Sequence, residues 1–183
     1  MKILIADDES IIRMGLKSML AGLGHEVMAA VNGREALQMT RRQEFDLAIL
    51  DIKMPYTDGL QAAKTIARTQ PMPIIMLTAF GDDELIEKAS ELPIHGYLIK
   101  PVAPAELSAA IQVAYKRFAE QQVLAKRAVQ LYKTLEMRKT VERAKGKLME
   151  NGMTEEEAYH QIQRTARDSG QSMHAVALAI LGE

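Results

Sequence analysis

Three carboxylates, one hydroxyl and one ammonium lie at the ends of short apolar runs in the first hundred residues. If these runs are parallel strands, their carboxyl ends meet at one edge of a sheet. Open α/β sheets place their functional crevice at that edge. We therefore expect the five side chains to converge on one site. They are Asp7, Asp8, Asp51, Thr78 and Lys100.

A cluster of this kind is suited to phosphoryl transfer assisted by a metal ion. Three neighbouring carboxylates repel one another, and a hard divalent cation such as Mg²⁺ relieves that repulsion while it shares phosphate oxygens. One aspartate can then attack a phosphoryl donor as a nucleophile. Lys100 and Thr78 would contact phosphoryl oxygens by charge and by a hydrogen bond. One such residue alone often has only a local role in a turn, but five at the expected strand ends favour a site.

The segments that must position these residues alternate between two patterns. Short apolar runs, typical of strands buried on both faces, are separated by amphipathic stretches of helical length. This alternation predicts βαβ units and a doubly wound α/β fold with a five-stranded parallel sheet. From Pro104, which suits a first helical turn, the chain is expected to be helical. The expected strands are residues 3–6, 26–31, 46–51, 73–79 and 96–100.

The composition excludes several classes of protein. The chain has 183 residues, of which 48% are hydrophobic and 26% charged, and its net charge is −1. These values are those of an ordinary globular protein. The chain has no cysteine, which rules out disulfides and thiolate metal sites. It has no signal-peptide pattern and no apolar run long enough to span a membrane, so we expect a cytoplasmic protein that does not contact a membrane.

The helical tail begins with a long helix that carries a heptad pattern. Apolar or small residues, and one glutamine, Gln121, recur at alternating steps of four and three from Leu107 to Leu135, which indicates a coiled-coil-like helix with a weak seam. The first half of this seam could equally pack on its own domain, whereas the later half favours dimerisation. Two shorter helices complete a small three-helix unit. Their expected signals are the stop Asn151-Gly152, the capping box of Thr154 and Glu157, the stop Ser169-Gly170 and the cap Ser172.

Residues 1–120 resemble the receiver domains of two-component response regulators. The motifs that carry this resemblance are "ADDE", "LDIKMPYTDG", "LTA" and "YLIKP". The resemblance implies a flavodoxin-like fold with strand order 2-1-3-4-5. It also implies that Asp51 accepts the phosphoryl group, and that Mg²⁺ is bound by Asp7, Asp8, Asp51 and the backbone carbonyl of Lys53.

The same resemblance implies a switch and a partner. Thr78 and Tyr97 would form the coupled switch pair, and Lys100 would contact the phosphoryl group. We expect a cis peptide bond between Lys100 and Pro101, which an X-Pro bond adopts at small cost. Phe80 flanks the site and would tune the lifetime of the phosphoryl group. The phosphoryl donor implied by the family is a sensor histidine kinase.

The stretch "VERAKGKLMENG" lies in the most basic part of the chain. Residues 126–147 hold eight basic and two acidic residues, an excess that can attract a polyanion. Lys139, Arg143 and Lys147 are spaced by four and form one stripe of a helix. The alternative is a basic face that is merely solvated. Because the tail offers few side chains that could read base edges, the basic face suits structured RNA better than duplex DNA.

Residues from about 126 to 182, with "ERAKGKLMENGMTEEEAYHQIQRTA", resemble an ANTAR domain. This is the RNA-binding output module of transcription antitermination regulators. The resemblance implies that a dimer presents two modules to RNA stem-loops, so that a terminator hairpin does not form. Gly146 would allow close approach of a partner. From charge and helical position we predict RNA contacts at Lys139, Arg143, Lys145, Lys147, Arg164 and Arg167.

The sequence therefore predicts a phosphorylation-controlled regulator in two parts. Residues 1–120 would be the receiver, and residues 121–183 the coiled-coil linker with the RNA-binding module. The chain would not be an enzyme beyond phosphoryl transfer onto its own Asp51. Two alternatives stay open: a DNA-binding response regulator, or an output module whose basic face binds an acidic protein.

Overall fold

A computed structural model describes residues 1–79 and 92–182 of the chain. The expected helix between the fourth and fifth strands, and Phe80 with it, lie outside the described residues. The chain divides into two compact units, Met1–Gln122 and Val123–Glu183.

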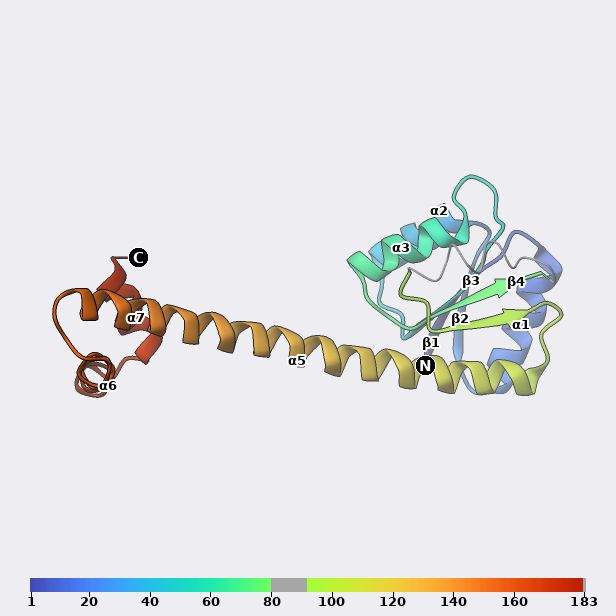
Figure 1. Cartoon of the computed structure of the whole chain (residues 1–183). Coiled ribbons are helices and arrows are strands. Elements are labelled where there is room, and N and C mark those ends of the chain that lie inside the picture. Colours follow the sequence, from blue (N-terminus) through green and yellow to red (C-terminus); the bar gives the residue numbers. More distant parts are fainter. Residues whose placement is uncertain (80–91, 183) are drawn as a thin grey trace. The chain divides into compact units, whose positions relative to one another are not determined.

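The first unit is built on a parallel sheet of five strands. The strands lie in the order β2-β1-β3-β4-β5, and every neighbouring pair is parallel (Figure 1). This is the predicted doubly wound, flavodoxin-like order, and each strand lies within two residues of its expected bounds. The strands are β1 (Lys2–Ala6), β2 (Glu26–Ala30), β3 (Leu47–Asp51), β4 (Ile74–Thr78) and β5 (Gly96–Ile99).

Helices cover both faces of this sheet. On one face, α2 (Gly33–Arg42) and α3 (Gly59–Thr69) place Ala36, Ala62 and Ile66 in a core with the buried side chains of the strands. On the other face, α1 (Ser10–Gly22) and the first turns of α5 (Pro104–Glu150) complete a second core. The sheet is therefore buried on both sides, as its continuous apolar runs predict.

The long helix α5 has 47 residues and belongs to both units. It begins at Pro104, as predicted. Leu107, Ile111 and Ala114, the first positions of the heptad seam, are buried in the second core of the first unit. The first half of the seam therefore packs on its own domain, which was one of the two interpretations left open by the sequence.

The second unit is a three-helix unit around a small core. It contains the last turns of α5, then α6 (Glu155–Ser169) and α7 (Met173–Leu181). Its core joins side chains from all three helices: Ala144, Leu148, Ala158, Ile162, Ala166, Val176 and Ala177. Burial of this apolar surface is what holds such short helices together, since helices of this length are marginal alone in water.

The predicted helix boundaries of the second unit are confirmed. Thr154 and Glu157 form the reciprocal capping box at the start of α6. Gly170 ends α6 in the left-handed conformation, and the hydroxyl of Ser172 accepts a hydrogen bond from the backbone of Ala175 in α7. None of the helices in the described part of the chain combines the length and apolar character needed to cross a lipid bilayer.

Candidate functional site

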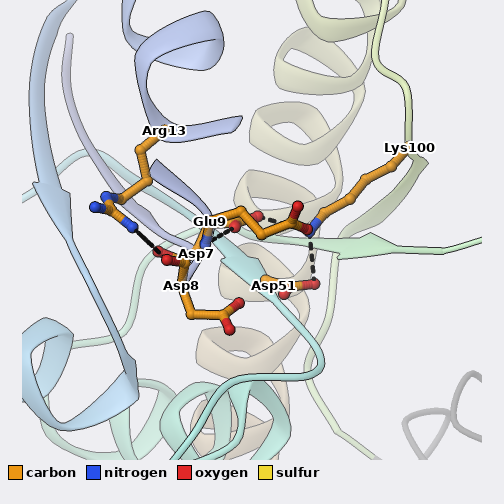
Figure 2. A network of polar contacts seen from close by, with 6 residues as sticks. All are labelled: Asp7, Asp8, Glu9, Arg13, Asp51 and Lys100. Atoms are coloured by element: carbon orange, nitrogen blue, oxygen red, sulfur yellow. Dashed lines mark hydrogen bonds and ion pairs between the residues drawn. The ribbon is translucent and has the colours of Figure 1, made fainter. Parts of the chain in front are cut away.

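Three carboxylates converge beyond the carboxyl ends of β1 and β3. Asp7 and Asp8 follow β1, and Asp51 is the last residue of β3. One carboxylate oxygen from each lies within 4.8 Å of the others, although Asp7 and Asp51 are buried and Asp8 is exposed (Figure 2). The structure thus brings together the three acidic residues named from the sequence, with one side open to solvent.

Lys100 enters the same cluster from the end of β5. Its Nζ lies 2.7 Å from Oδ2 of Asp7 and 3.3 Å from Oδ1 of Asp51. Burial disfavours the charged ammonium, but the contacts with Asp7 and Asp51 outweigh this effect and raise the pKa of Lys100. The ammonium is therefore positively charged beside Asp51 at neutral pH. The peptide bond between Lys100 and Pro101 is cis, as predicted.

Asp51 is an unusual carboxylate in this setting. Burial raises its pKa to about 6; the Lys100 ammonium opposes the shift, and the nearby charge of Asp7 adds to it. A carboxylate that is costly to ionise gains from a nearby cation. The buried Oδ2 of Asp7 contacts the Lys100 ammonium at 2.7 Å, and each carboxylate oxygen can accept more than one contact. Hard oxygen donors with spare capacity, close together and partly open to water, fit Mg²⁺.

The turn after β3 is held close to Asp51 by a glycine. Gly59, the first residue of α3, donates its N–H to the carbonyl of Ile52 at 3.0 Å. A Cβ at this position would overlap the carbonyl oxygen of Asp51. Asp58 caps α3 by accepting a hydrogen bond from the backbone of Gln61. A side chain at position 59 would therefore displace the end of β3 that carries Asp51. Lys53, in the same turn, is exposed.

Thr78 and Tyr97 lie on neighbouring strands. Thr78 ends β4 fully buried, and its hydroxyl donates to the carbonyl of Ala79 at 3.2 Å. Tyr97, on β5, is half-buried against the core on the side of α2 and α3, and burial raises the pKa of its phenol. A hydroxyl bonded to its own neighbouring carbonyl can rotate to another acceptor at small cost.

Two further residues contact the acidic cluster and were not identified from the sequence. Glu9 donates its backbone N–H to Oδ1 of Asp7 at 2.8 Å, and its carboxylate lies 3.6 Å from Nζ of Lys100. Arg13 donates from Nη1 to the main-chain carbonyls of Asp7 and Asp8 (Figure 2). Glu9 could have been found in the "ADDE" motif, but contacts to main-chain carbonyls leave no signal in residue type.

The basic residues of the second unit are divided by their surroundings. Lys139 is exposed and forms an ion pair with Glu136 at 2.9 Å. Exposed ion pairs of this kind contribute little to stability. Lys147 is exposed and donates to the last carbonyl of α7, at Leu181, over 3.3 Å. Arg143 is exposed on the same helix. All three residues are exposed on the continuous helix α5, and their spacing of four places them along one stripe of it.

Lys145 differs from that stripe. Only 7% of the residue is exposed, and its ammonium lies 2.7 Å from Glu155 and 3.0 Å from Glu142. The hydrogen bonds to Glu155 and Glu142 raise the pKa of Lys145. Lys145 thus lies beside Ala144, a buried residue of the core of the second unit. Because the ammonium already joins α5 to the start of α6, this geometry does not favour a contact between Lys145 and RNA.

The remaining predicted contacts lie on α6. Arg164 and Arg167 are both exposed on this helix. Gly146, on α5, is exposed, and a Cβ placed there would meet nothing within 4 Å. Packing inside the unit therefore does not require glycine at 146.

The middle of α5, which contributes to neither the core of the first unit nor that of the second, carries an exposed apolar stripe. Leu124, Leu131 and Leu135 are 63%, 66% and 47% exposed. Their separations of seven and four residues place them on one side of the helix together with Ala128. Large aliphatic side chains exposed at heptad spacing are typical of a helix that associates with another helix.

The chain matches two known families. Residues 3–112 match the response regulator receiver domain, and residues 129–181 match the ANTAR domain. The transcriptional regulatory protein PdtaR of Mycobacterium tuberculosis (strain CDC 1551 / Oshkosh) is 42% identical over 182 residues, which cover 98% of this chain and 89% of PdtaR.

Other relatives share the first unit. The probable transcriptional regulator ycf27 of Galdieria sulphuraria is 42% identical over 116 residues, which cover 63% of this chain and 46% of ycf27. The crystal structure of a response regulator receiver domain protein from Clostridium thermocellum superimposes with a TM-score of 0.58 at 35% identity. It covers 67% of this chain and 98% of that protein. The chain thus belongs to the response regulators in which a receiver domain is followed by an ANTAR domain.

Proposed function

We propose that this protein is a phosphorylation-controlled transcription antiterminator that binds RNA stem-loops as a dimer. The observation that carries the proposal is the convergence of Asp7, Asp8, Asp51 and Lys100 in a receiver domain whose last helix, α5, continues into an ANTAR domain. We place the boundary between the two functional parts at residues 120 and 121, within α5.

Asp51 is the proposed phospho-acceptor. An oxygen of its carboxylate attacks the phosphorus of a phosphohistidine on a sensor kinase, the bond from phosphorus to the histidine nitrogen breaks, and an acyl phosphate remains on Asp51. The carboxylates of Asp7, Asp8 and Asp51 and the backbone carbonyl of Lys53 would hold Mg²⁺, which supplies charge neutralisation for the phosphoryl oxygens when bound. The ammonium of Lys100, 3.3 Å from Asp51, supplies a further positive charge.

The proposed switch begins at Thr78. Its hydroxyl leaves the carbonyl of Ala79 and donates instead to a phosphoryl oxygen, which frees space for Tyr97 to turn further inward. A phosphoryl group adds nearly two negative charges at this edge of the sheet. The rearranged surface includes β5 and the start of α5, so the change reaches the helix that carries the exposed stripe of Leu124, Leu131 and Leu135. Phosphorylation would thereby promote dimerisation through α5.

The output is proposed to be RNA binding by the second unit. The candidate contacts are exposed cations on α5 and α6, which suit the phosphates of a folded RNA. Lys145, which we predicted from its charge, is better assigned to holding α6 against α5. The proposed contacts are Lys139, Arg143, Lys147, Arg164 and Arg167.

Two separate assays test this proposal. Intact-mass spectrometry after incubation with acetyl phosphate and Mg²⁺ should detect one added phosphoryl group, and Asp51→Asn should abolish it. Salt-dependent binding of the phosphorylated protein should favour a stem-loop RNA over duplex DNA of equal length. Preference for duplex DNA would support the DNA-binding alternative, and absence of binding to either would support an output that binds protein.

A further inference from the structure

Arg13 contacts the acidic cluster through main-chain atoms. It lies in the first turns of α1 and is half-buried. Its Nη1 donates to the carbonyl of Asp7 at 2.7 Å and to the carbonyl of Asp8 at 2.8 Å. One guanidinium nitrogen carries two hydrogens, so a single group bridges two successive carbonyls. Hydrogen bonds from a charged donor at these distances are among the stronger ones in proteins.

These carbonyls belong to the short segment that connects β1 to α1. The segment holds two acidic side chains whose orientation decides whether they face Asp51. The carboxylate of Asp7 is held by two contacts. Its Oδ1 accepts a hydrogen bond from the backbone N–H of Glu9 at 2.8 Å, and its Oδ2 faces the ammonium of Lys100. Arg13 approaches the main-chain side (Figure 2). Among the described residues, the side chain of Arg13 donates hydrogen bonds to both carbonyls.

We propose that Arg13 is a positioning residue for the metal site, and that it acts by fixing the main chain of Asp7 and Asp8. The proposal rests on the Mg²⁺ site proposed above. Asp8 depends most on such support, because its carboxylate is exposed and its neighbour Glu9 caps α1 without a side-chain hydrogen bond. Partners that orient metal ligands in this way typically contribute tenfold to a hundredfold in metal affinity.

Because Arg13 is charged, the direction in which its substitution changes the Mg²⁺ affinity tests the proposal. A guanidinium close to a divalent cation repels it, so removal of the charge alone would tighten Mg²⁺ binding. Loss of the two hydrogen bonds would weaken binding, because Asp7 and Asp8 would no longer be held in place. Charge and positioning therefore predict opposite results for Arg13→Met. Arg13→Lys keeps the charge, but its side chain is one bond shorter than arginine and replaces the planar guanidinium.

The experiment measures Mg²⁺ binding to the unphosphorylated full-length protein by calorimetry. We expect Arg13→Met to weaken binding by roughly tenfold or more and Arg13→Lys to weaken it in the same direction. Melting curves without metal give the folded fraction of each variant, so that a general loss of stability is separated from a loss of affinity. If Arg13→Met does not fold, Arg13→Lys decides the question.

Each outcome has a distinct meaning. Unchanged affinity in folded Arg13→Met, or tighter binding, would overturn the positioning role while leaving the metal site intact. Wild-type protein that binds no Mg²⁺ would overturn both proposals. Asp8→Asn serves as the reference for loss of a direct ligand, and Lys17→Met, an exposed cation on the same helix, as the matched control for a change of charge.

Discussion

The ammonium of Lys100 lies 3.3 Å from the carboxylate of Asp51, across the gap between the ends of β5 and β3. This contact links the proposed phospho-acceptor to the strand that carries Tyr97. A negative group added to Asp51 would remain within reach of Lys100, whose positive charge does not depend on pH in the neutral range. The strand that carries Tyr97, the proposed switch residue, is therefore connected to the charge of Asp51 through Lys100.

Asp51→Asn should stabilise the protein in the absence of Mg²⁺ while abolishing phosphorylation. The pKa of Asp51 is raised in the folded state to about 6. Its contribution to stability is therefore present at low pH and lost as the pH rises through about 6. At about pH 7.5 the neutral amide avoids the cost of a buried charge, and we expect the free energy of unfolding to rise by about 1–2 kcal/mol.

Chemical denaturation with and without Mg²⁺ measures this effect. Glu44→Gln removes an exposed carboxylate and is the matched control, for which we expect little change. The stabilisation by Asp51→Asn should shrink towards pH 4, where the wild-type carboxyl is protonated. A lower stability of Asp51→Asn at neutral pH would contradict the cost assigned to this carboxylate.

His95, the residue before β5, ties the start of β4 to the part of α5 that belongs to the first unit. It is 5% exposed; its Nδ1 accepts from the backbone of Ile74 at 3.1 Å, and its Nε2 lies 2.9 Å from Oε1 of Gln121. Nδ1 is thus the unprotonated nitrogen, and Nε2 donates. The ring of Phe118 packs edge-on at 5.3 Å, and Arg117 donates to the carbonyl of His95.

Stability should fall in mild acid because of His95. Burial lowers its pKa, an effect that the bond to Gln121 opposes and the Arg117 charge reinforces. The unfolded chain then takes up a proton near pH 6.5 that the folded chain does not bind. The contribution of neutral His95 is fully present above that pH and declines below it. His95→Ala should cost about 1–3 kcal/mol, because the N–H of Ile74 loses its acceptor.

Unfolding measurements at a series of pH values separate the effect of His95 protonation from the effect of losing the acceptor for Ile74. His95→Gln should flatten the loss of stability below about pH 6.5, whereas His160→Gln, an exposed control, should leave it unchanged. An identical acid slope in His95→Gln would show that other groups cause it. Nuclear magnetic resonance of the imidazole nitrogens offers an independent check, since it reports the tautomer directly.

Lys145 and Lys147 should have different effects although they are two residues apart. Lys145→Ala removes the ammonium between Glu155 and Glu142, so the second unit should melt at a lower temperature. Lys147→Ala removes an exposed cation and should weaken RNA binding with little change in melting. RNA binding by Lys147→Ala should also depend less on salt: the slope of the logarithm of the binding constant against the logarithm of the salt concentration should fall by about one. Equal loss of RNA affinity in both folded variants would return Lys145 to the RNA-binding face.

Leu131→Glu should prevent dimerisation without unfolding either unit. The side chain is 66% exposed, so its replacement disturbs no core of the described chain. A charge at a heptad position repels its counterpart in a second copy. Sedimentation of the phosphorylated variant should therefore give a monomer, whereas Lys133→Glu, an exposed control in the same stretch, should remain dimeric. A dimeric Leu131→Glu would place the interface elsewhere.

Much of the fold and of the site was predictable because it depends on short-range patterns. Apolar runs of strand length between helical stretches determined the sheet, and the residues at the ends of those runs, such as Asp51 and Lys100, had to meet at one edge. The caps at Thr154 and Ser172 were equally local. The later course of α5 was harder to predict, because one heptad pattern continues from buried Leu107 to exposed Leu135 and does not itself show where the burial ends.

The contacts that were missed depend on distance in space rather than on residue type. Arg13 binds carbonyls, which every residue possesses, and His95 depends on Gln121, a residue 26 positions away. Lys145 pairs with Glu155, which lies ten residues away beyond the turn that ends α5. Charge alone could not reveal these contacts, which are why our proposal assigns Lys145 to holding α6 against α5.

Sedimentation of a labelled stem-loop RNA with the protein, before and after treatment with acetyl phosphate and Mg²⁺, tests the central claim most directly. We predict that phosphorylation increases the fraction of RNA bound and that the complex contains two protein chains. Asp51→Asn should give the untreated result under both conditions. Binding of the same RNA, with the same stoichiometry, by untreated protein, treated protein and Asp51→Asn would contradict control of this regulator by phosphorylation of Asp51.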